Sequence, residues 1–342
     1  DIIVRGEGEI TMKEICSGLP VEKITGITHK GGQTADRPVI EDIDILPIPA
    51  YHLVDFKKYY PPVGGYRQLP AMLMVTSRGC VNLCTYCYQP FGKRIRQRSA
   101  EKLLEEVRLL ALTYGIRELS IYDDNFSTRK KNVERFCELL IGFMKKEKIK
   151  MTWSCFARAD WLRPKTALLM KKAGCHHILF GVESADEQVR KNINKNLHMD
   201  RVIKTSRMIK KIGIQTRASF MFGLPGDTKE TMEETIKLAL KIDPDLVHFN
   251  ILAPNPGTPV YKWGVENGYI EPGDWESYDL ATVKLKIPTA TEEEILKAYK
   301  DAHRRFHFRP RFIFKRLIRS FTPLGFMANW QGLKAILTLI RN

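Results

Sequence analysis

Residues 78–87 read Arg-Gly-Cys-Val-Asn-Leu-Cys-Thr-Tyr-Cys, and this stretch places three cysteines within eight residues directly after a short apolar run. Such a loop can wrap a metal centre. Three thiolates match three irons of a [4Fe–4S] cube and leave the fourth iron without a protein ligand, as catalytic zinc sites keep one position open. An open iron is a place where a small molecule can chelate. We therefore predict that a [4Fe–4S] cluster is held by Cys80, Cys84 and Cys87.

The sequence around this loop alternates between short apolar runs and amphipathic helical stretches from residue 71 to residue 252. Leu103, Val107 and Leu110, for example, recur at helical spacing. Alternating βα units form a parallel sheet, and right-handed crossovers curl six consecutive units into a barrel or an open part of one. The predicted fold class is therefore α/β, with a partial (β/α)6 TIM-like barrel. Six strands are expected, at residues 71–76, 118–123, 151–155, 177–181, 215–220 and 246–252.

The sequence indicates where two helices begin and predicts the range of a third. Ser99 is placed to cap one helix, with Glu101 in its first turn. Asp227, with Glu230 three residues later, resembles a capping box before another helix. A further helix is expected after the barrel, over residues 292–306.

Composition excludes several classes of protein. The chain has 342 residues, of which 44% are hydrophobic and 27% charged, and its mean hydropathy is −0.26, so it is neither disordered nor fibrous. No apolar run approaches the roughly 20 residues of a membrane span. The seven cysteines are odd in number, three of them are clustered, and no signal peptide is recognisable. This pattern favours a reducing cytoplasm over a secreted disulfide framework.

The net charge of +16 is unevenly distributed along the chain. Residues 302–342 contain nine Lys and Arg and no Asp or Glu, which is more than half of the excess. A basic excess can meet nucleic acid, an anionic membrane surface or an acidic substrate, and composition alone does not choose between them.

The spacing Cys-x3-Cys-x2-Cys, with the aromatic Tyr86 before the third cysteine and a predicted strand before the first, resembles the radical S-adenosylmethionine (SAM) superfamily. In that family the open iron binds the amino and carboxylate groups of SAM. One electron from the cluster then cleaves the sulfonium to methionine and a 5′-deoxyadenosyl radical. The chemistry agrees with the predicted site, because an electron-rich cluster in contact with a cationic sulfur can inject an electron into a C–S bond.

The resemblance implies that residues at the carboxyl ends of the strands bind SAM, since barrel active sites are assembled there. Asp123 and Asp124 follow the second strand, at the family's position for the SAM amino group. Glu183 and Ser184 belong to a turn similar to the ribose-binding GVxS motif, and Lys195 lies where a basic residue often meets the SAM carboxylate. Taken singly, such residues are also common in turns and ion pairs. The other SAM-contact candidates are Tyr86, Arg158, Arg217 and Ser219, with Pro256 and Gly257 in a turn whose backbone lines the adenine.

Three further segments narrow the resemblance to the cobalamin-dependent class of radical SAM enzymes. They are GEGE at 6–9, DIDILPIPAYHLVD at 42–55 and RRFHFRPRFIFKRL at 304–317. In that class a Rossmann-like cobalamin domain precedes the barrel, and residues 1–15 resemble only its last strand and helix. The family's Asp-x-His-x-x-Gly motif, which draws a histidine to cobalt, is absent from the sequence. We therefore expect a remnant of the cobalamin domain plus a linker in 1–70, the radical SAM core in 71–288 and a basic, aromatic extension in 289–342.

Residues 2–4 are expected to form a strand that, alone, would lack sheet neighbours. We therefore expect the natural gene product to extend upstream by a domain of βα units with a cobalt-approaching histidine. The present chain is then expected to bind cobalamin weakly or not at all. The alternative is a short enzyme in which Ile2, Ile3 and Val4 pack on the barrel.

The expected function is radical SAM catalysis on an unactivated carbon of a small-molecule or lipid substrate, leading to methylation, cyclisation or rearrangement. A reductant such as ferredoxin or flavodoxin is the expected electron donor. A radical SAM enzyme that modifies nucleic acid is the main rival, motivated by an isoelectric point near 9.5, but no RNA-binding module accompanies the barrel. No catalytic side chain is assigned from the sequence.

Two readings of the cysteine loop lie outside this enzyme class. A structural Cys3His zinc site is disfavoured because the nearest histidines, His52 and His176, are far away in the sequence. A non-catalytic iron–sulfur protein that transfers electrons is disfavoured because such carriers need no pocket and usually ligate every iron.

The basic C-terminal region is expected to contact an anionic or lipidic surface. Basic residues interleave with aromatic ones over residues 304–317, and residues 332–340 add a second apolar stretch with Lys334. This combination suits an interfacial helix, where each basic residue near an anionic leaflet contributes about 1 kcal/mol. In the alternative interpretation the aromatic residues close the open side of the barrel.

The remaining polar and sulfur-containing residues are interpreted as structural. The scattered cysteines are expected to be small buried hydrophobes, His176 and His177 are expected to be structural, and the basic residues after the cluster loop are expected to form a solvated segment rather than a binding site for an anionic substrate. The cysteines concerned are Cys16, Cys137, Cys155 and Cys175, and the basic residues are Lys93, Arg94, Arg96 and Arg98.

Overall fold

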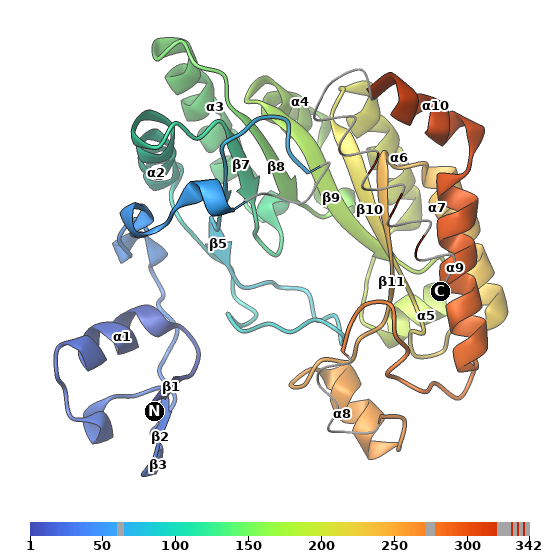
Figure 1. Ribbon diagram of the computed structural model, residues 1–342, viewed down its shortest axis with the longest axis horizontal. Helices are drawn as coiled ribbons and strands as arrows, with labels where there is room; N and C mark the ends of the chain where they lie inside the picture. The colour runs from blue at the N-terminus through green and yellow to red at the C-terminus, as the bar shows by residue number, and fades with distance from the viewer. Residues whose placement is uncertain (60–64, 271–277, 320–329, 331–333, 335–337, 339–342) are drawn as a thin grey trace.

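The structure is a computed structural model that describes residues 1–59, 65–270 and 278–319, together with residues 330, 334 and 338. Its centre is a sheet of six strands in the order β11-β10-β9-β8-β7-β4, and every neighbouring pair is parallel (Figure 1). All six strands predicted from the sequence are present, and each pairs with its neighbour in the predicted series. They are β4 (Ala71–Met74), β7 (Glu118–Ile121), β8 (Thr152–Phe156), β9 (Cys175–Glu183), β10 (Gln215–Phe222) and β11 (Leu246–Ile251).

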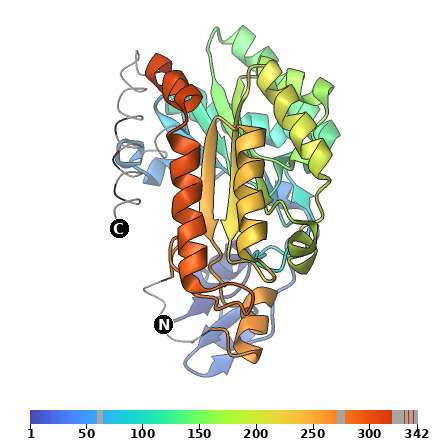
Figure 2. The ribbon, with the colours of Figure 1, turned by 90° about the vertical axis from the view of Figure 1, so that its right-hand side faces the viewer.

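Helices cover one face of this sheet, as the alternating pattern predicted (Figures 1 and 2). Two short helices, α5 (Glu187–Asn192) and α8 (Pro259–Glu266), follow β9 and β11 at the carboxyl ends of the strands. The fold is therefore α/β, an open part of a (β/α) barrel, as expected. The covering helices are α2 (Ala100–Thr113), α3 (Lys130–Lys146), α4 (Pro164–Lys172), α6 (Met199–Lys211), α7 (Lys229–Ile242) and α9 (Glu292–His307).

Alternation along each strand separates an apolar outer face from a partly polar inner face. On β8, Trp153 and Cys155 are buried among the helices, whereas Ser154 and Phe156 line the inside of the barrel. The buried Trp153 indole also donates to the backbone oxygen of Ala173 at 2.8 Å, so its polar atom is satisfied. The covering helices thus bury the core, and the inner face is left for chemistry.

The helix starts agree with the sequence at one position and differ at another. Ser99 caps α2, since its side chain accepts from the backbone N–H of Lys102. The capping box predicted at Asp227 and Glu230 is wrong: Thr228 and Thr231 form it, one residue further along. Asp227 instead accepts from the backbone N–H of Leu224 at 3.0 Å, which closes the preceding turn and removes its carboxylate from the helix start.

The N-terminal region forms a small antiparallel sheet of its own. It contains β1 (Ile3–Val4), β2 (Ile27–His29) and β3 (Gly32–Gln33) with α1 (Gly8–Cys16), and Ile3 pairs with Thr28. The expectation that residues 2–4 lack a sheet neighbour within the chain is therefore wrong. The pairing partner is Ile27–His29, a hairpin strand of only three residues that lies more than 20 positions further along the chain. Short 3-10 helices complete the region at Val21–Lys23, Ile43–Ile45, Tyr51–Leu53 and Phe56–Lys58.

Ion pairs fasten this N-terminal region to the barrel. Glu7 lies 2.7 Å from the buried guanidinium of Arg96 and 3.3 Å from that of Arg78. Arg98 pairs with Glu106 of α2 at 2.5 Å, and both side chains are buried. Arg98 also donates to the backbone oxygen of Leu46 at 2.7 Å, which joins it to the N-terminal region. The interpretation of the basic run after the cluster loop as solvated is therefore wrong for Arg96 and Arg98, because both are buried and ion-paired.

The C-terminal region packs on the outer face of the sheet. The buried Phe306 of α9 contacts Phe249 of β11, and Phe312 of α10 (Pro310–Arg319) packs against Phe306. α9 lies beside α7 on the helix-covered face (Figure 2), so these aromatic residues do not close the open side of the barrel. Ile313 and Phe314 remain exposed. The second apolar stretch, 332–340, lies outside the described residues apart from residues 334 and 338.

Within the described part of the chain, no helix is both long and apolar enough to cross a bilayer.

The structural interpretation of the scattered residues holds with two corrections. Cys137, Cys155 and Cys175 are buried as expected, but Cys16 is exposed at the end of α1. His176 is structural, yet it does have a carboxylate partner: its Nε2 lies 2.7 Å from Oε1 of the buried Glu118. This pair joins the first residues of β7 and β9, and the sequence separation of 58 positions concealed it.

Candidate active site

The cysteine loop is held at both ends by a small antiparallel ribbon, β5 (Ser77–Arg78) and β6 (Arg96–Gln97). Gly79 enters the loop with a φ of +85°, and a Cβ there would lie 2.3 Å from the backbone oxygen of Arg94. Only glycine fits this close crossing of two backbones. The ribbon therefore fixes where the loop begins and ends above the barrel.

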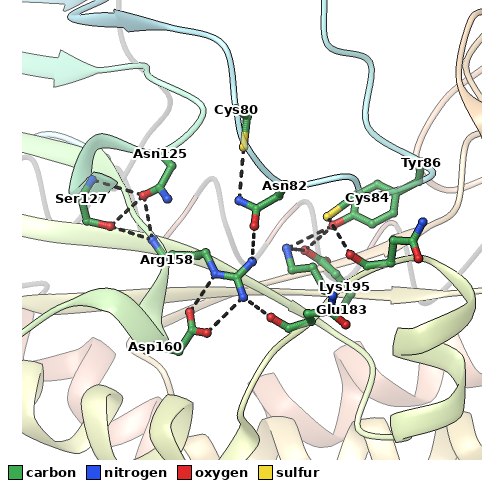
Figure 3. A network of polar contacts seen from close by, with 12 residues as sticks. Cys80, Asn82, Cys84, Tyr86, Asn125, Ser127, Arg158, Asp160, Glu183 and Lys195 are labelled. Carbon is green, nitrogen blue, oxygen red and sulfur yellow. Dashed lines mark hydrogen bonds and ion pairs between the residues drawn. The ribbon is translucent and has the colours of Figure 1, made fainter. Parts of the chain in front are cut away.

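The three thiols line a cavity of about 140 Å³ at the carboxyl ends of the strands. Figure 3 shows two of them, Cys80 and Cys84, with the polar residues nearby. Cys80 and Cys84 are buried, and Cys87 is partly exposed. Burial, followed by the charges of Cys84 and Asp124, raises the pKa of the Cys87 thiol to about 11. Metal binding must therefore displace protons from these sulfurs.

Among the residues that the structure describes, no three His, Cys, Asp or Glu side chains come close enough to share one metal ion. In a [4Fe–4S] cube each thiolate binds a different iron, so the sulfurs stand apart. The amide of Asn82 donates to Cys80 Sγ at 3.3 Å.

Lys195, Glu183 and Tyr86 form a group beside the cysteines, in which Glu183 is buried and the other two are partly buried (Figure 3). Lys195 Nζ lies 3.0 Å from Glu183 Oε1, and the Tyr86 hydroxyl donates to the same oxygen at 3.1 Å. Burial lowers the pKa of Lys195, but the charges of Glu183 and Cys84 outweigh burial and raise it overall. Lys195 therefore stays protonated next to the cysteine loop.

The backbone of β9 is shaped to place Glu183 here. Gly181 has no side chain, and a Cβ there would lie 2.1 Å from Glu183 Oε1 and 3.0 Å from Lys195 Nζ. Glu183 itself adopts a φ of +70°, a strained conformation for a residue with a side chain. Its second oxygen, Oε2, is buried without a hydrogen-bond partner. A buried acceptor of this kind requires a donor, such as a sugar hydroxyl.

Arg158 and the polar residues around it were only partly predicted. Arg158 donates to Asn82 Oδ1 at 2.7 Å and pairs with Asp160 at 2.9 Å (Figure 3). Its backbone N–H donates to Asn125 Oδ1 and to Ser127 Oγ, both at 3.2 Å. Sequence reasoning assigned no site role to Asn82, although its place between two cysteines was an available signal. Arg158 thus supports the cysteine loop from below through Asn82.

Asp123 does not line the cavity. Its carboxylate turns back and accepts from the backbone N–H of Thr76 at 2.6 Å and of Ser77 at 3.0 Å, as well as from both hydroxyls. It therefore fastens the end of β4 to the end of β7. Asp124 and Asn125 are the residues of this segment that face the cavity.

The structure gathers some of the remaining candidates near the cysteines and separates others. Gly257 lies beside the ring of Tyr88 in the cluster loop, where an added Cβ would approach the ring to 3.3 Å, and Pro256 precedes it in the same turn. Ser184 is buried away from the cavity, with its hydroxyl 3.4 Å from that of Thr235. Ser219 accepts from Asn250 on the inner face of β10, and Arg217 lines a different cavity deeper in the barrel.

The residues present thus fit the two groups that the cysteine spacing implies. The cluster would be held by Cys80, Cys84 and Cys87, and the unpartnered Oε2 of Glu183 together with the charged Lys195 would face SAM.

Comparison with known proteins identifies the family of the chain. Residues 74–239 match the family model of the radical SAM superfamily. The chain is 33% identical to an uncharacterized methyltransferase, PH0819, of Pyrococcus horikoshii over 96% of this chain and 74% of that protein. It is 28% identical to an anaerobic magnesium-protoporphyrin IX monomethyl ester cyclase of Cereibacter sphaeroides and 26% identical to a hopanoid C-2 methylase of Rhodopseudomonas palustris. The matches to these last two cover 90% and 80% of this chain, which spans about half of each relative's length.

Among solved structures, the cobalamin-dependent SAM radical enzyme OxsB with aqua-cobalamin and SAM bound resembles this fold with a TM-score of 0.69. That match covers 96% of this chain and 56% of the OxsB chain at 16% identity. The chain belongs to the radical SAM superfamily, as the cysteine spacing predicted.

Proposed function

We propose that this chain is a radical SAM enzyme that methylates, cyclises or rearranges an unactivated carbon of a small-molecule or lipid substrate. When bound, the cluster supplies one electron that cleaves SAM to methionine and a 5′-deoxyadenosyl radical. The observation that carries the proposal is the cavity in which three thiols face the Lys195–Glu183 pair, with one glutamate oxygen unpartnered.

The residues of the cavity have separate tasks in this proposal. Cys80, Cys84 and Cys87 hold three irons and leave the fourth for SAM. Lys195 offers a positive charge to the SAM carboxylate, and Glu183 Oε2 accepts from a ribose hydroxyl. Tyr86 keeps Glu183 in place by donating to its other oxygen. Asp124, which lines the cavity and makes no hydrogen bond within the described chain, is the acceptor we assign to the SAM amino group.

The names of the relatives support the reaction classes in this proposal. They include methyltransferases, whose chemistry adds one carbon, and a cyclase that acts on magnesium-protoporphyrin IX monomethyl ester. A porphyrin ester and a hopanoid are both largely apolar molecules, which favours a small molecule or lipid over nucleic acid.

The sequence has no Asp-x-His-x-x-Gly motif, by which cobalamin-dependent relatives bring a histidine to cobalt. We infer that this chain alone binds cobalamin weakly, because no residue pattern in it supplies a histidine to cobalt. Stoichiometric cobalamin binding by the reconstituted chain, followed by absorbance during titration, would contradict this inference.

We further propose that the C-terminal region contacts an anionic membrane. Ile313 and Phe314 of α10 are exposed, which favours it, but Arg309 and Lys315 already pair with Asp243. Flotation with anionic liposomes tests it: the full chain should float more than a truncation after Arg309, which keeps all of α9 and removes α10.

Anaerobic reconstitution tests the main proposal. The chain is loaded with iron and sulfide under anaerobic conditions and then given SAM and a strong reductant. We expect about four irons per chain by spectroscopy and 5′-deoxyadenosine by chromatography. A cluster that forms without any SAM cleavage would instead support the non-catalytic iron–sulfur protein.

A further inference from the structure

A second cavity lies inside the barrel, below the cysteine cavity. It has a volume of about 60 Å³ and is lined from β7, β8, β9 and β10, with Gly65 from the N-terminal linker. Phe156 and Leu179 line both cavities, so the two cavities are neighbours. Whatever occupies the deeper cavity therefore comes close to the space in front of the cysteines.

Arg217 is the charged residue of this deeper cavity. It lies near the start of β10, on the inner face, and is partly buried. Its Nε is fully buried without a hydrogen-bond partner, and the described part of the chain offers the guanidinium no carboxylate. Desolvation lowers the pKa of Arg217, and Tyr122 is the group that opposes this. An arginine taken out of water without a counter-ion is costly unless a ligand supplies the anion.

Arg217 differs in this respect from other inward or buried arginines, each of which has an acceptor. Arg190, which also makes no ion pair within the described chain, donates to the backbone oxygens of Ser184 at 2.9 Å and Ala185 at 2.5 Å. Arg96 pairs with Glu7, Arg98 pairs with Glu106 and Arg158 pairs with Asp160. The chain thus provides a carboxylate for each of these three guanidinium groups. At Arg217 it provides none among the described residues.

The neighbours of Arg217 add hydroxyl groups and apolar surface but no negative charge. Burial, followed by the charge of Arg217, keeps the pKa of His177 well below its usual range, so this imidazole is neutral at physiological pH. Ser120, Ser154 and Tyr122 contribute hydroxyl groups. Tyr122 also packs edge-to-face against Phe156, with ring centroids 4.7 Å apart, and gives the cavity an aromatic wall.

We propose that this cavity binds a carboxylate or phosphate group of the substrate, with Arg217 as the residue that recognises it. A guanidinium presents two parallel N–H donors that match the oxygens of either anion. The aromatic wall takes the apolar body of the same molecule. The anion then lies deep in the barrel, and the rest of the substrate extends past Phe156 and Leu179 toward the cysteines.

This inference deepens the proposed function and rests on it for the identity of the ligand as substrate. The proposed function requires a substrate carbon near the SAM cavity. A fixed anion at the far end of the molecule would set which carbon lies there, because position decides reactivity when a radical is generated at one place.

Calorimetry on the cluster-reconstituted chain tests the inference with three probes of similar size: benzoate, phenyl phosphate and the neutral benzamide. We expect the wild-type chain to bind at least one of the two anions about tenfold more tightly than benzamide. Preference for benzoate would indicate a carboxylate substrate, and preference for phenyl phosphate would indicate a phosphate. Arg217→Met should abolish the preference, and Arg217→Lys should restore part of it.

Two matched variants locate the binding. Arg207→Met removes the same charge from an exposed position on α6 and should leave anion binding unchanged. Lys195→Met removes the cation beside the cysteines and should also leave the preference for anions in place. Loss of anion binding in Lys195→Met, with retention in Arg217→Met, would place the anion at the upper cavity and overturn the inference.

Thermal melting separates loss of anion binding from unfolding, and SAM cleavage separates this inference from the proposed function. Because Arg217 has no counter-ion, Arg217→Met should melt no lower than the wild-type chain, so lost binding cannot be ascribed to unfolding. If the wild-type chain cleaves SAM but shows no preference for either anion, the inference is wrong and the proposed function stands. If it binds the anions through Arg217 but holds no iron, the proposed function fails and the anion site stands.

Discussion

The upper and the lower cavity of the barrel balance their charges differently. In the upper cavity Lys195 lies 3.0 Å from Glu183, and Arg158 lies 2.9 Å from Asp160. In the lower cavity Arg217 has no such partner among the described residues. The upper cavity is thus set in position before any ligand arrives, whereas the lower one is completed electrostatically only by a ligand.

The difference follows from where the side chains come from. The upper cavity is built from loops and strand ends, which can bring Lys195 and Asp160 from outside the sheet. The lower cavity is built from the inner face of the strands, where every second residue points inward and space is limited. A carboxylate opposite Arg217 would occupy the space that a substrate needs.

The largest expected effect is the loss of iron binding and of SAM cleavage when one cysteine of the upper cavity is replaced. Cys84→Ala should lower iron content to near zero and abolish formation of 5′-deoxyadenosine, because a cube with two protein ligands is not retained. Iron assay and chromatography on the reconstituted variant measure both. Cys16→Ala, at an exposed position outside the site, is the control and should retain full iron content. Full iron loading of Cys84→Ala would refute the assignment.

The next effect concerns stability rather than chemistry. Asp123→Ala leaves the backbone N–H groups of Thr76 and Ser77 without acceptors in a buried position. We expect the free energy of unfolding in urea to fall by about 3 kcal/mol. The neighbouring Asp124→Ala removes a carboxylate that makes no such bonds and should change stability by no more than about 0.5 kcal/mol. Equal losses in the two variants would show that Asp123 does not fasten the strands.

A smaller effect is expected on SAM binding. Glu183→Gln keeps the shape of the side chain but removes its charge, so SAM affinity should fall by about 1 to 3 kcal/mol while iron content is unchanged. Equilibrium dialysis of the reconstituted variant with labelled SAM measures the change. Glu187→Gln, at an exposed position on α5, should bind SAM as the wild-type chain does. An unaltered affinity in Glu183→Gln would exclude a direct contact.

The smallest expected effect is on the pH dependence of stability. It concerns Asp227, a buried carboxyl group that makes no ion pair within the described chain. Burial raises the pKa of Asp227 to about 7. The folded chain therefore binds more protons than the unfolded chain between about pH 4 and pH 7, and stability falls as pH rises through this window.

Asp227→Asn should remove this contribution, which amounts to at most about 1.4 kcal/mol per pH unit. Urea unfolding at pH 5 and pH 8 measures it: the decline between the two values should be smaller in the variant. Glu234→Gln, exposed on the same helix, should leave the decline unaltered. A decline of the same size in Asp227→Asn would show that this carboxyl group is not the cause.

Much of the fold could be predicted because its signals are local. The three cysteines and the six strands are each recognisable from a few consecutive residues. The direction in which a side chain turns is not local. Asp123 and Asp124 are adjacent, yet one fastens β4 and the other faces the cavity.

Partners that are distant in the sequence were also out of reach. Arg96 and Glu7 are 89 positions apart, so the basic run after the cysteine loop gave no sign of being buried. Arg217 was grouped with the SAM contacts because it precedes a typical turn, and only the structure separates it from the cysteines. What the sequence could not supply is which charges meet each other.

The order of the strands has a consequence for synthesis. Each βα unit pairs with the one before it, so units can dock in turn as the chain leaves the ribosome. The cysteine loop, however, is covered by contacts made much later: Cys84 Sγ meets the backbone oxygen of Asn194, 110 positions downstream. Protein synthesis proceeds at about 5 to 20 residues per second, so roughly 5 to 20 s pass between synthesis of the cysteines and synthesis of the segment that covers them. We therefore expect the thiols to stay uncovered until four of the six strands have been made, and oxygen during that interval to be a hazard to them.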